Sequence, residues 1–229
     1  MSAQLAQSAV VHTLRPSVSL TSRTSDSEHF DLFQGLGARM TFDRDAEIYG
    51  EGEAADFVYR VASGCVRTYK VLADGRRQIG DFLLPGDVFG LEAGADHLLS
   101  AEAICRSEVI VCRRSALFNM ALRSSDVGHA LWSLTARELE RAQSHLMLLG
   151  RKSACERVAT FLQTLSDRFP EDPEICLHMS RQDMADYLGL TIETVSRTFT
   201  QLQSEGVIAL HGCRKVEVLS RQALRRKTY

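Results

Sequence analysis

The sequence predicts an α+β fold with an N-terminal antiparallel β-barrel, a long dimerisation helix and a C-terminal winged helix-turn-helix. Three observations predict it. Short alternating runs with glycine turns fill residues 38–114, apolar residues step by three and four between residues 132 and 149, and two short helical patterns flank Gly189. The 229 residues can form two modest domains, and a hydrophobic fraction of 45% is that of a globular chain.

Composition and charge narrow the class of protein. No apolar run approaches the roughly 20 residues that span a bilayer, and the polar N-terminus lacks a signal pattern, so we expect a cytoplasmic protein without a membrane partner. The six cysteines are scattered without C-x-x-C pairing, which is typical of reduced thiols. The net charge is −2, but residues 151–229 carry twelve Lys and Arg against ten Asp and Glu, so this part is weakly basic.

The N-terminal part divides near residue 28. Residues 1–27 are rich in Ser, Thr, Gln and Ala, which predicts a flexible tail, and residues 28–36 predict a short helix. The alternating runs that follow are typical of a barrel or sandwich. Residues 28–114 are therefore assigned to a sensor-like β-barrel domain, with strands expected at residues 57–61, 65–71, 79–84 and 107–112.

A long helix is predicted over residues 115–150, beginning at either Ser115 or Asp126. A narrow apolar seam on it has the spacing of a two-stranded coiled coil and predicts a homodimer interface. The members of this seam are Trp132, Thr135, Leu139, Ala142, Leu146 and Leu149. Leu131, Leu134 and Leu148 widen the stripe, so a single amphipathic helix packed on its own barrel is the alternative. Gly150 interrupts the pattern and is the predicted hinge.

Residues 151–229 read as a winged helix-turn-helix domain. An amphipathic helix over residues 152–169 ends before Pro170, and a short strand is expected at residues 175–179. Runs at residues 207–210 and 215–219, joined through Gly212, predict a β-hairpin wing. Residues 220–227 form a basic tail with a last helical turn.

Residues 180–203 (S-R-Q-D-M-A-D-Y-L-G-L-T-I-E-T-V-S-R-T-F-T-Q-L-Q) predict the helix-turn-helix itself. Ser180 caps the first helix with Asp183 as its capping-box partner, Gly189 makes the turn, and Thr191 caps the second helix. The second helix has an apolar inner stripe and a polar outer face. An ordinary pair of packed helices is the alternative, but outer-face groups that can hydrogen-bond base edges favour DNA recognition.

Several motifs resemble those of the CRP/FNR family of bacterial transcription regulators. They are G-E-G-E-A-A-D-F-V-Y at residues 50–59, S-G-C-V-R at 63–67, L-P-G-D-V-F-G at 84–90, L-G-L-T-I-E-T-V-S-R at 188–197 and S-E-G-V-I at 204–208. The resemblance covers roughly residues 30–219. It implies a cyclic-nucleotide-binding-like jelly roll for the barrel and a homodimeric transcription regulator rather than an enzyme. No nucleophile–base set or phosphate-binding glycine loop points to catalysis.

Departures from the family pattern narrow the function. The phosphate cassette reads F-G-L-E-A-G at residues 89–94, and Leu99 stands where a cyclic phosphate would need an arginine, so we expect no cAMP binding. Glu92 is interpreted as a structural carboxylate. No cysteine precedes Cys65, and the histidines lack ligand spacing, so we expect no iron–sulfur cluster, haem or other cofactor. The G-L-E-A-G cassette is similar to that of the FixK-like branch.

The resemblance and the outer face of the second helix together predict how DNA is read. Arg197 suits guanine, Glu193 suits the cytosine amine, and Ser196 and Ile192 suit a T/A step, as in a TTGA half-site of a TTGA-N6-TCAA palindrome. The alternatives are that Glu193 complements the helix dipole and that Arg197 is a solvated charge. The predicted phosphate contacts are Ser180, Arg181, Gln182, Thr191, Thr200, Arg214 and Lys215.

The sequence therefore predicts a homodimeric transcription activator whose partners are double-stranded DNA, a second copy of the chain and RNA polymerase holoenzyme. One alternative is a ligand-gated regulator that responds to an unidentified small molecule or a redox signal. Cys213 in the wing is the possible redox-sensitive thiol, and an inert thiol is its alternative. A signalling protein with a vestigial DNA-binding domain is a further alternative, but the polar recognition face argues against it.

Overall fold

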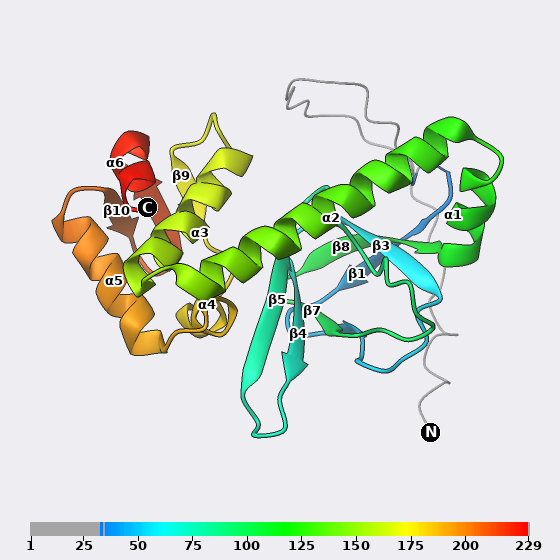
Figure 1. The fold of residues 1–229 in the computed structure, drawn as a ribbon, viewed down its shortest axis with the longest axis horizontal. Coiled ribbons are helices and arrows are strands. Elements are labelled where there is room, and N and C mark those ends of the chain that lie inside the picture. The colour runs from blue at the N-terminus through cyan, green and yellow to red at the C-terminus, as the bar shows by residue number, and fades with distance from the viewer. Residues whose placement is uncertain (1–32, 34, 229) are drawn as a thin grey trace.

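Two four-stranded antiparallel sheets form the N-terminal domain in the computed structural model, which describes residue 33 and residues 35–228 (Figure 1). One sheet has the order β1-β8-β3-β6 and the other β2-β7-β4-β5. The strands are β1 (Ala38–Phe42), β2 (Glu47–Tyr49), β3 (Phe57–Ser63), β4 (Val66–Val71), β5 (Arg77–Leu83), β6 (Val88–Phe89), β7 (Ser100–Ala103) and β8 (Ser107–Arg113). This is the strand order of a jelly roll, which confirms the predicted fold class. The ladders do not join into one closed barrel.

Close packing between turns holds the two sheets together. The turn before β4 places Gly64 at φ +87°, and a Cβ there would lie 2.3 Å from the Ser107 hydroxyl, so only glycine fits. The Ser107 hydroxyl accepts a hydrogen bond from the Cys65 backbone N–H at 3.0 Å. Inside, alternating residues such as Val61, Val66 and Val109 are almost fully buried.

The long helix begins at the later of its two predicted starts. Helix α1 (Arg114–Ala121) ends first, and Ser124 then caps α2 (Ser125–Arg151) by accepting from the Val127 N–H at 3.5 Å. The predicted hinge at Gly150 is wrong in position. Helix α2 continues through Gly150, and the chain turns at Lys152 and Ser153 because Ser153 starts the next helix with a capping box.

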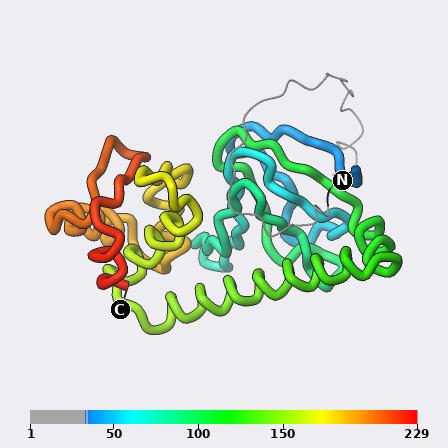
Figure 2. The backbone as a smooth tube through the Cα atoms, turned by 90° about the horizontal axis from the view of Figure 1, so that it is seen from above, coloured from blue at the N-terminus to red at the C-terminus, as the bar shows by residue number. Residues whose placement is uncertain are grey.

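Helix α2 has two different faces. One face lies along the N-terminal domain (Figure 2). Val127 is buried there, Leu131 and Leu134 pack against the same core cluster, and Leu148 near the end of the helix is buried in the core shared with the C-terminal domain. The opposite face carries the predicted seam and is open to solvent. The alternative of a helix packed on its own domain therefore describes only half of the α2 surface.

The C-terminal domain follows the predicted order. Its elements are α3 (Ala154–Arg168), β9 (Glu174–Cys176), α4 (Arg181–Leu188), α5 (Ile192–Ser204), β10 (Ile208–His211), β11 (Lys215–Val218) and α6 (Arg221–Arg226). Strands β10 and β11 form the predicted wing hairpin, and β9 extends it to a three-stranded sheet. The strand expected at residues 175–179 is shorter, because residues 177–180 turn into the cap of α4.

Arg157 joins the long helix to the helix-turn-helix. From α3, its guanidinium donates to the carbonyl oxygens of Leu149 and Lys152 at the end of α2, both at 2.9 Å. It also donates to the Leu188 carbonyl oxygen at the end of α4 at 2.9 Å. The last carbonyl groups of a helix have no N–H partner within that helix. One cation thus provides donors for such carbonyl groups at the ends of two helices.

The tail predicted at residues 1–27 and most of the helix predicted at residues 28–36 lie outside the described residues. Within the described part of the chain, no helix has the length and apolar character that crossing a membrane requires.

Replacing Arg157 should destabilise the joint. Arg157→Leu leaves several helix-end carbonyls without their charged donor, so the free energy of unfolding should fall by about 2–4 kcal/mol in urea denaturation. Arg151→Leu is the matched control, because Arg151 is exposed at the end of the same helix and should change stability by less than about 0.5 kcal/mol. Equal effects of the two variants would contradict this role of Arg157.

Candidate nucleic-acid interface

Two side-chain caps define the helix-turn-helix. The Ser180 hydroxyl accepts from the Asp183 N–H at 3.0 Å, and the Asp183 carboxylate accepts from the Ser180 N–H at 2.9 Å. Helix α4 ends at Gly189, which has the left-handed φ of 61° that a C-cap glycine adopts. Thr191 caps α5 by accepting from the Thr194 N–H at 3.3 Å. The predicted caps and turn are confirmed.

The inner faces of α4 and α5 form one core. Met184, Ala185 and Leu188 of α4 are at most 1% exposed, and so are Val195 and Phe199 of α5. Leu202 continues this buried stripe. Because the inner face is fixed in this core, the outer face of α5 has a single orientation relative to α4.

The outer face of α5 is free. Glu193, Ser196, Arg197 and Thr200 are exposed, and Ile192 is 38% exposed although it begins the inner apolar stripe of the predicted helix. Within the described part of the chain, no carboxylate lies within ion-pair distance of Arg197. The four predicted base-contacting residues therefore share one accessible surface.

Glu193 remains an ionised acceptor on this surface. Its own backbone N–H and the Thr191 hydroxyl hydrogen-bond the carboxylate, and Arg197 lies nearby, so the pKa of Glu193 is below its ordinary value. The carboxylate thus complements the N-terminus of α5 in the free protein, and it keeps the lone pairs that a cytosine amine would need.

The polar residues predicted to bind phosphate are partly engaged within the protein. The Ser180 hydroxyl donates to Asp183 at 2.7 Å, and Gln182 donates to Asp186 at 2.7 Å. The Thr200 hydroxyl donates to the Ser196 carbonyl at 3.1 Å. Thr191 serves as the α5 cap. A phosphate at this end of α4 would therefore meet free backbone N–H groups before it met the Ser180 hydroxyl.

Arg181 is a preformed cation between the two helices. Its guanidinium carbon lies 3.4 Å from the centroid of the Phe199 ring, and no carboxylate of the described residues pairs with it. Burial lowers the pKa of Arg181 to about 10, so the side chain still carries its charge at neutral pH. An unpaired, partly desolvated guanidinium is a favourable partner for a phosphate.

The wing supplies the remaining basic groups. Arg214 and Lys215 are exposed, and Lys215 pairs with Glu174 at 3.0 Å on the surface, a pair that contributes little and opens easily. Cys213 is an exposed free thiol in the same turn, and Cys176 is a second exposed thiol on the neighbouring strand. No cluster of three possible metal-binding side chains occurs among the described residues.

The predicted dimer seam faces solvent along α2. Trp132, Leu139 and Leu146 are 74%, 58% and 70% exposed, and Thr135 and Ala142 are also exposed. Leu149 differs, because it packs against the core of the C-terminal domain. Among the residues that the structure describes, the first five seam residues thus form one exposed stripe, apolar except for Thr135, that nothing covers.

Two family models match this chain, one for each domain. The family model of the Crp-like helix-turn-helix domain matches residues 156–227, and that of the cyclic nucleotide-binding domain matches residues 39–124. The nitrogen fixation regulation protein FixK of Azorhizobium caulinodans is 49% identical over 83% of this chain and 79% of its own length. The chain belongs to the FixK-type regulators of the CRP/FNR family.

Two further relatives agree with this family. FixK of Rhizobium meliloti is 44% identical over 86% of the chain and 92% of its own length. The solved structure of FixK2 from Bradyrhizobium japonicum is 48% identical, covers 85% of this chain and 98% of that one, and superposes with a TM-score of 0.82. This FixK-type chain is therefore a DNA-binding transcription regulator and not an enzyme, as the sequence predicts.

Sequence reasoning missed the charged contacts that hold this FixK-type DNA-binding domain on the jelly roll. Arg67 and Arg77 of the jelly roll bind Asp183 and Asp186 of α4 across more than 100 residues of sequence. Arg157 was missed as well. No periodic pattern marks such residues, and only the place of Asp183 in a capping box was visible beforehand.

Replacing Arg181 should weaken DNA binding without changing sequence preference. Arg181→Leu keeps apolar contact with Phe199 but removes one phosphate-binding charge from each chain of the proposed dimer, so affinity should fall at least tenfold and the salt slope by about two. Fluorescence anisotropy at several salt concentrations measures both. Arg226→Leu, an exposed cation in α6, is the control. A loss confined to one DNA sequence would contradict a phosphate role for Arg181.

Proposed function

We propose that this protein is a homodimeric transcription activator that binds a TTGA-N6-TCAA-type palindrome without cAMP or an iron–sulfur cluster. The observation that carries the proposal is the free outer face of α5, whose recognition groups are exposed while its inner face is locked in the core. DNA, a second copy of the chain and RNA polymerase holoenzyme are the partners in the cytoplasm. Activation is supported by relatives such as the transcriptional activator protein Anr of Pseudomonas protegens, which is 36% identical over 75% of this chain.

Each base-contacting residue has a chemical role in this proposal. The Arg197 guanidinium binds guanine O6 and N7, and the Glu193 carboxylate accepts from the cytosine amine. Ser196 hydrogen-bonds a neighbouring base edge, and Ile192 contacts a thymine methyl group. The partly exposed side chain of Ile192 supports the last contact.

The seam on α2 supports the dimer. A parallel coiled coil seats each core side chain in a hole formed by four residues of the partner helix. Towards the start of α2 the seam spacing continues through the small residues Gly128 and Ser125, which line a shallow hollow beside Trp132. The Trp132 ring of a second copy would fill the space above Gly128. This fit favours a parallel, in-register pair of helices.

A cyclic nucleotide does not fit the residues of the jelly-roll pocket. Leu99 and Glu92 line it, and one buried oxygen of the Glu92 carboxylate has no hydrogen-bond partner among the described residues. The other Glu92 oxygen lies 3.1 Å from His97 Nδ1. An anionic phosphate would therefore meet a carboxylate and a leucine instead of a guanidinium, which is unfavourable in a site shielded from water. This chemistry supports regulation without cAMP.

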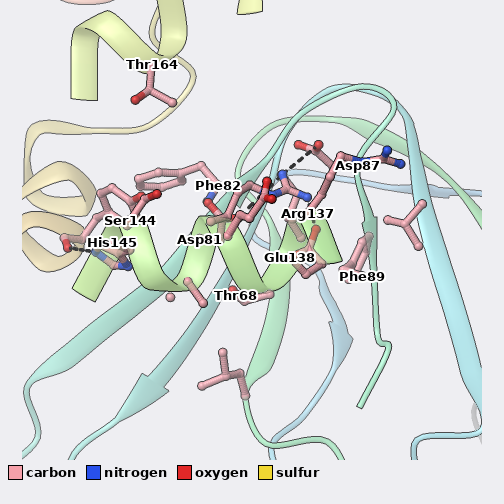
Figure 3. A pocket seen from close by; sticks show the side chains of 18 of the residues that line it. Thr68, Asp81, Phe82, Asp87, Phe89, Arg137, Glu138, Ser144, His145 and Thr164 are labelled. Atoms are coloured by element: carbon pink, nitrogen blue, oxygen red, sulfur yellow. Dashed lines mark hydrogen bonds and ion pairs between the residues drawn. The ribbon is translucent and has the colours of Figure 1, made fainter. Parts of the chain in front are cut away.

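One observation favours a ligand-gated regulator as the second candidate function. The same pocket is a cavity of about 980 Å³ that extends between the jelly roll, α2 and α3, and groups of both charges line it (Figure 3). Asp81 and Asp87 come from the jelly roll, and Arg137 and Glu138 come from α2. Arg137 has no ion-pair partner among the described residues. A small polar molecule other than cAMP would suit this cavity.

The DNA-binding proposal predicts effector-independent binding. A duplex carrying TTGAT-N4-ATCAA should bind tightly at two chains per duplex in fluorescence anisotropy, at fixed salt and with no added ligand. A TGTGA/TCACA duplex should bind weakly. Arg197→Ala removes a bidentate base contact worth about 1–3 kcal/mol from each of the two half-sites, so it should weaken binding by at least about 30-fold. Weak binding to both duplexes until a small molecule is added would contradict the proposal and favour the second candidate.

The dimer proposal predicts a change of mass. Leu139→Glu places a charge at the centre of the seam, so light scattering coupled to size exclusion should show a fall from twice 25.5 kDa to 25.5 kDa. Met147→Glu is the matched control, because Met147 is 64% exposed on α2 but lies off the seam. A dimeric Leu139→Glu variant would place the interface elsewhere.

A further inference from the structure

Two arginines of the jelly roll hold the first helix of the helix-turn-helix. From β4, Arg67 donates to Asp183 of α4 at 2.9 Å and to Glu102 of β7 at 2.8 Å. The three side chains are only 10%, 7% and 13% exposed. From β5, Arg77 donates to Asp183 at 2.5 Å and to Asp186 at 2.9 Å. We call Arg67, Arg77, Asp183 and Asp186 the docking cluster.

The docking cluster is joined directly to the cap of α4. One carboxylate oxygen of Asp183 accepts from both arginines, and the other accepts from the N–H and the hydroxyl of Ser180. Burial raises the pKa of Asp183, but the Ser180 hydrogen bonds and the two guanidinium groups outweigh burial and hold the pKa below its ordinary value. The carboxylate is therefore charged at neutral pH. The end of α4 where DNA phosphates are proposed to bind is thus fixed to the jelly roll.

Apolar contacts surround the docking cluster. Ile79 and Phe82 of β5 belong to the same buried core as Met184 and Leu188 of α4. The rings of Phe82 and Tyr187 lie 5.3 Å apart, centroid to centroid. An orientation of α4 that breaks a buried ion pair leaves a charge without compensation, which is unfavourable. The ion pairs therefore favour the docked orientation.

The docked orientation leaves the recognition surface free. Helix α4 lies between α5 and the β4–β5 hairpin (Figure 1). The outer face of α5 is exposed, and so is the seam of α2. Within the described part of the chain, docking therefore covers neither the proposed DNA-binding surface nor the proposed dimer surface.

We infer that Arg67, Arg77, Asp183 and Asp186 are positioning residues for DNA binding, which hold α4 and α5 in the DNA-competent orientation without an effector. This inference rests on the proposed function. Two recognition helices read a palindrome only when their spacing is fixed. A DNA-binding domain released from the jelly roll samples other orientations, and the apparent affinity falls with the competent fraction.

A charge exchange at Arg77 and Asp186 tests the inference, because Asp186 lies outside the capping box. Arg77→Asp and Asp186→Arg should each weaken binding to the TTGAT-N4-ATCAA duplex at least tenfold, with the dimer mass unchanged. The double variant restores the pair between positions 77 and 186 but not the contact of Arg77 with Asp183, so it should bind at least threefold more tightly than either single variant. Arg76→Asp is the matched control, since Arg76 is exposed in the same hairpin and its ion-pair partner among the described residues is Asp74. It should bind like the wild type.

Hydrogen exchange provides a readout that does not depend on DNA. Arg77→Asp should lose amide protection in both α4 and β5, and the double variant should regain it. Should the charge-reversed chains fail to fold, Asp186→Asn weakens the same contact with little change in shape, and a loss of about threefold in affinity is expected.

Three results would overturn the inference. Unchanged affinity in Arg77→Asp despite lost protection means that docking does not position the helices. Higher affinity means that the contact restrains DNA binding. A double variant that regains amide protection but not DNA affinity would show that the restored contact does not determine DNA binding. Failure of the wild-type protein to bind the duplex is distinguishable, because it contradicts the proposed function itself.

Discussion

The carboxylate of Asp183 is the central contact between the helix-turn-helix and the jelly roll. One of its oxygens completes the cap of α4, and the other binds Arg67 and Arg77 of the jelly roll. The same group therefore decides where α4 begins and where α4 sits on the rest of the molecule. Because the inner faces of α4 and α5 share one core, the position of α4 also determines the position of the recognition face. Local folding and domain docking are linked at this single residue.

Helix α2 connects the docked domain with the proposed dimer. One face carries Val127 and Leu148 into contact with the rest of the chain, while the opposite face presents Trp132 and Leu139 to solvent. At its end, Arg157 ties the last carbonyls of α2 to the turn of the helix-turn-helix. A second copy paired along the exposed face would thus set the distance between two recognition helices. Pairing, docking and recognition use different surfaces, so they can operate together.

Features that depend on local sequence were predictable. The capping box at Ser180, the left-handed turn at Gly189 and the alternating strands follow from propensity and periodicity, and the structure confirms them. The bend after α2 was predicted at Gly150, but it lies at Lys152 and Ser153. Ser153 caps the next helix, and Arg157 binds the last carbonyl groups of α2, so the helix continues through the flexible glycine. The docking cluster could not be predicted, because an arginine in a strand and an aspartate in a helix give no signal that they meet. The roles of single residues in DNA binding remain predictions, which depend on the exposure of α5.

The central claim is that the two recognition helices are held at a fixed spacing before any effector or DNA is present. Double electron–electron resonance tests it most directly, because it measures the distance between two spin labels in the dimer. One label is attached in α5 of each chain through Gln203→Cys, and the exposed Cys176 and Cys213 are replaced by serine. The account predicts one narrow distance distribution in the free dimer, which addition of the TTGAT-N4-ATCAA duplex leaves in place. A broad distribution in the free dimer, narrowing only when DNA or a small molecule is added, would contradict it.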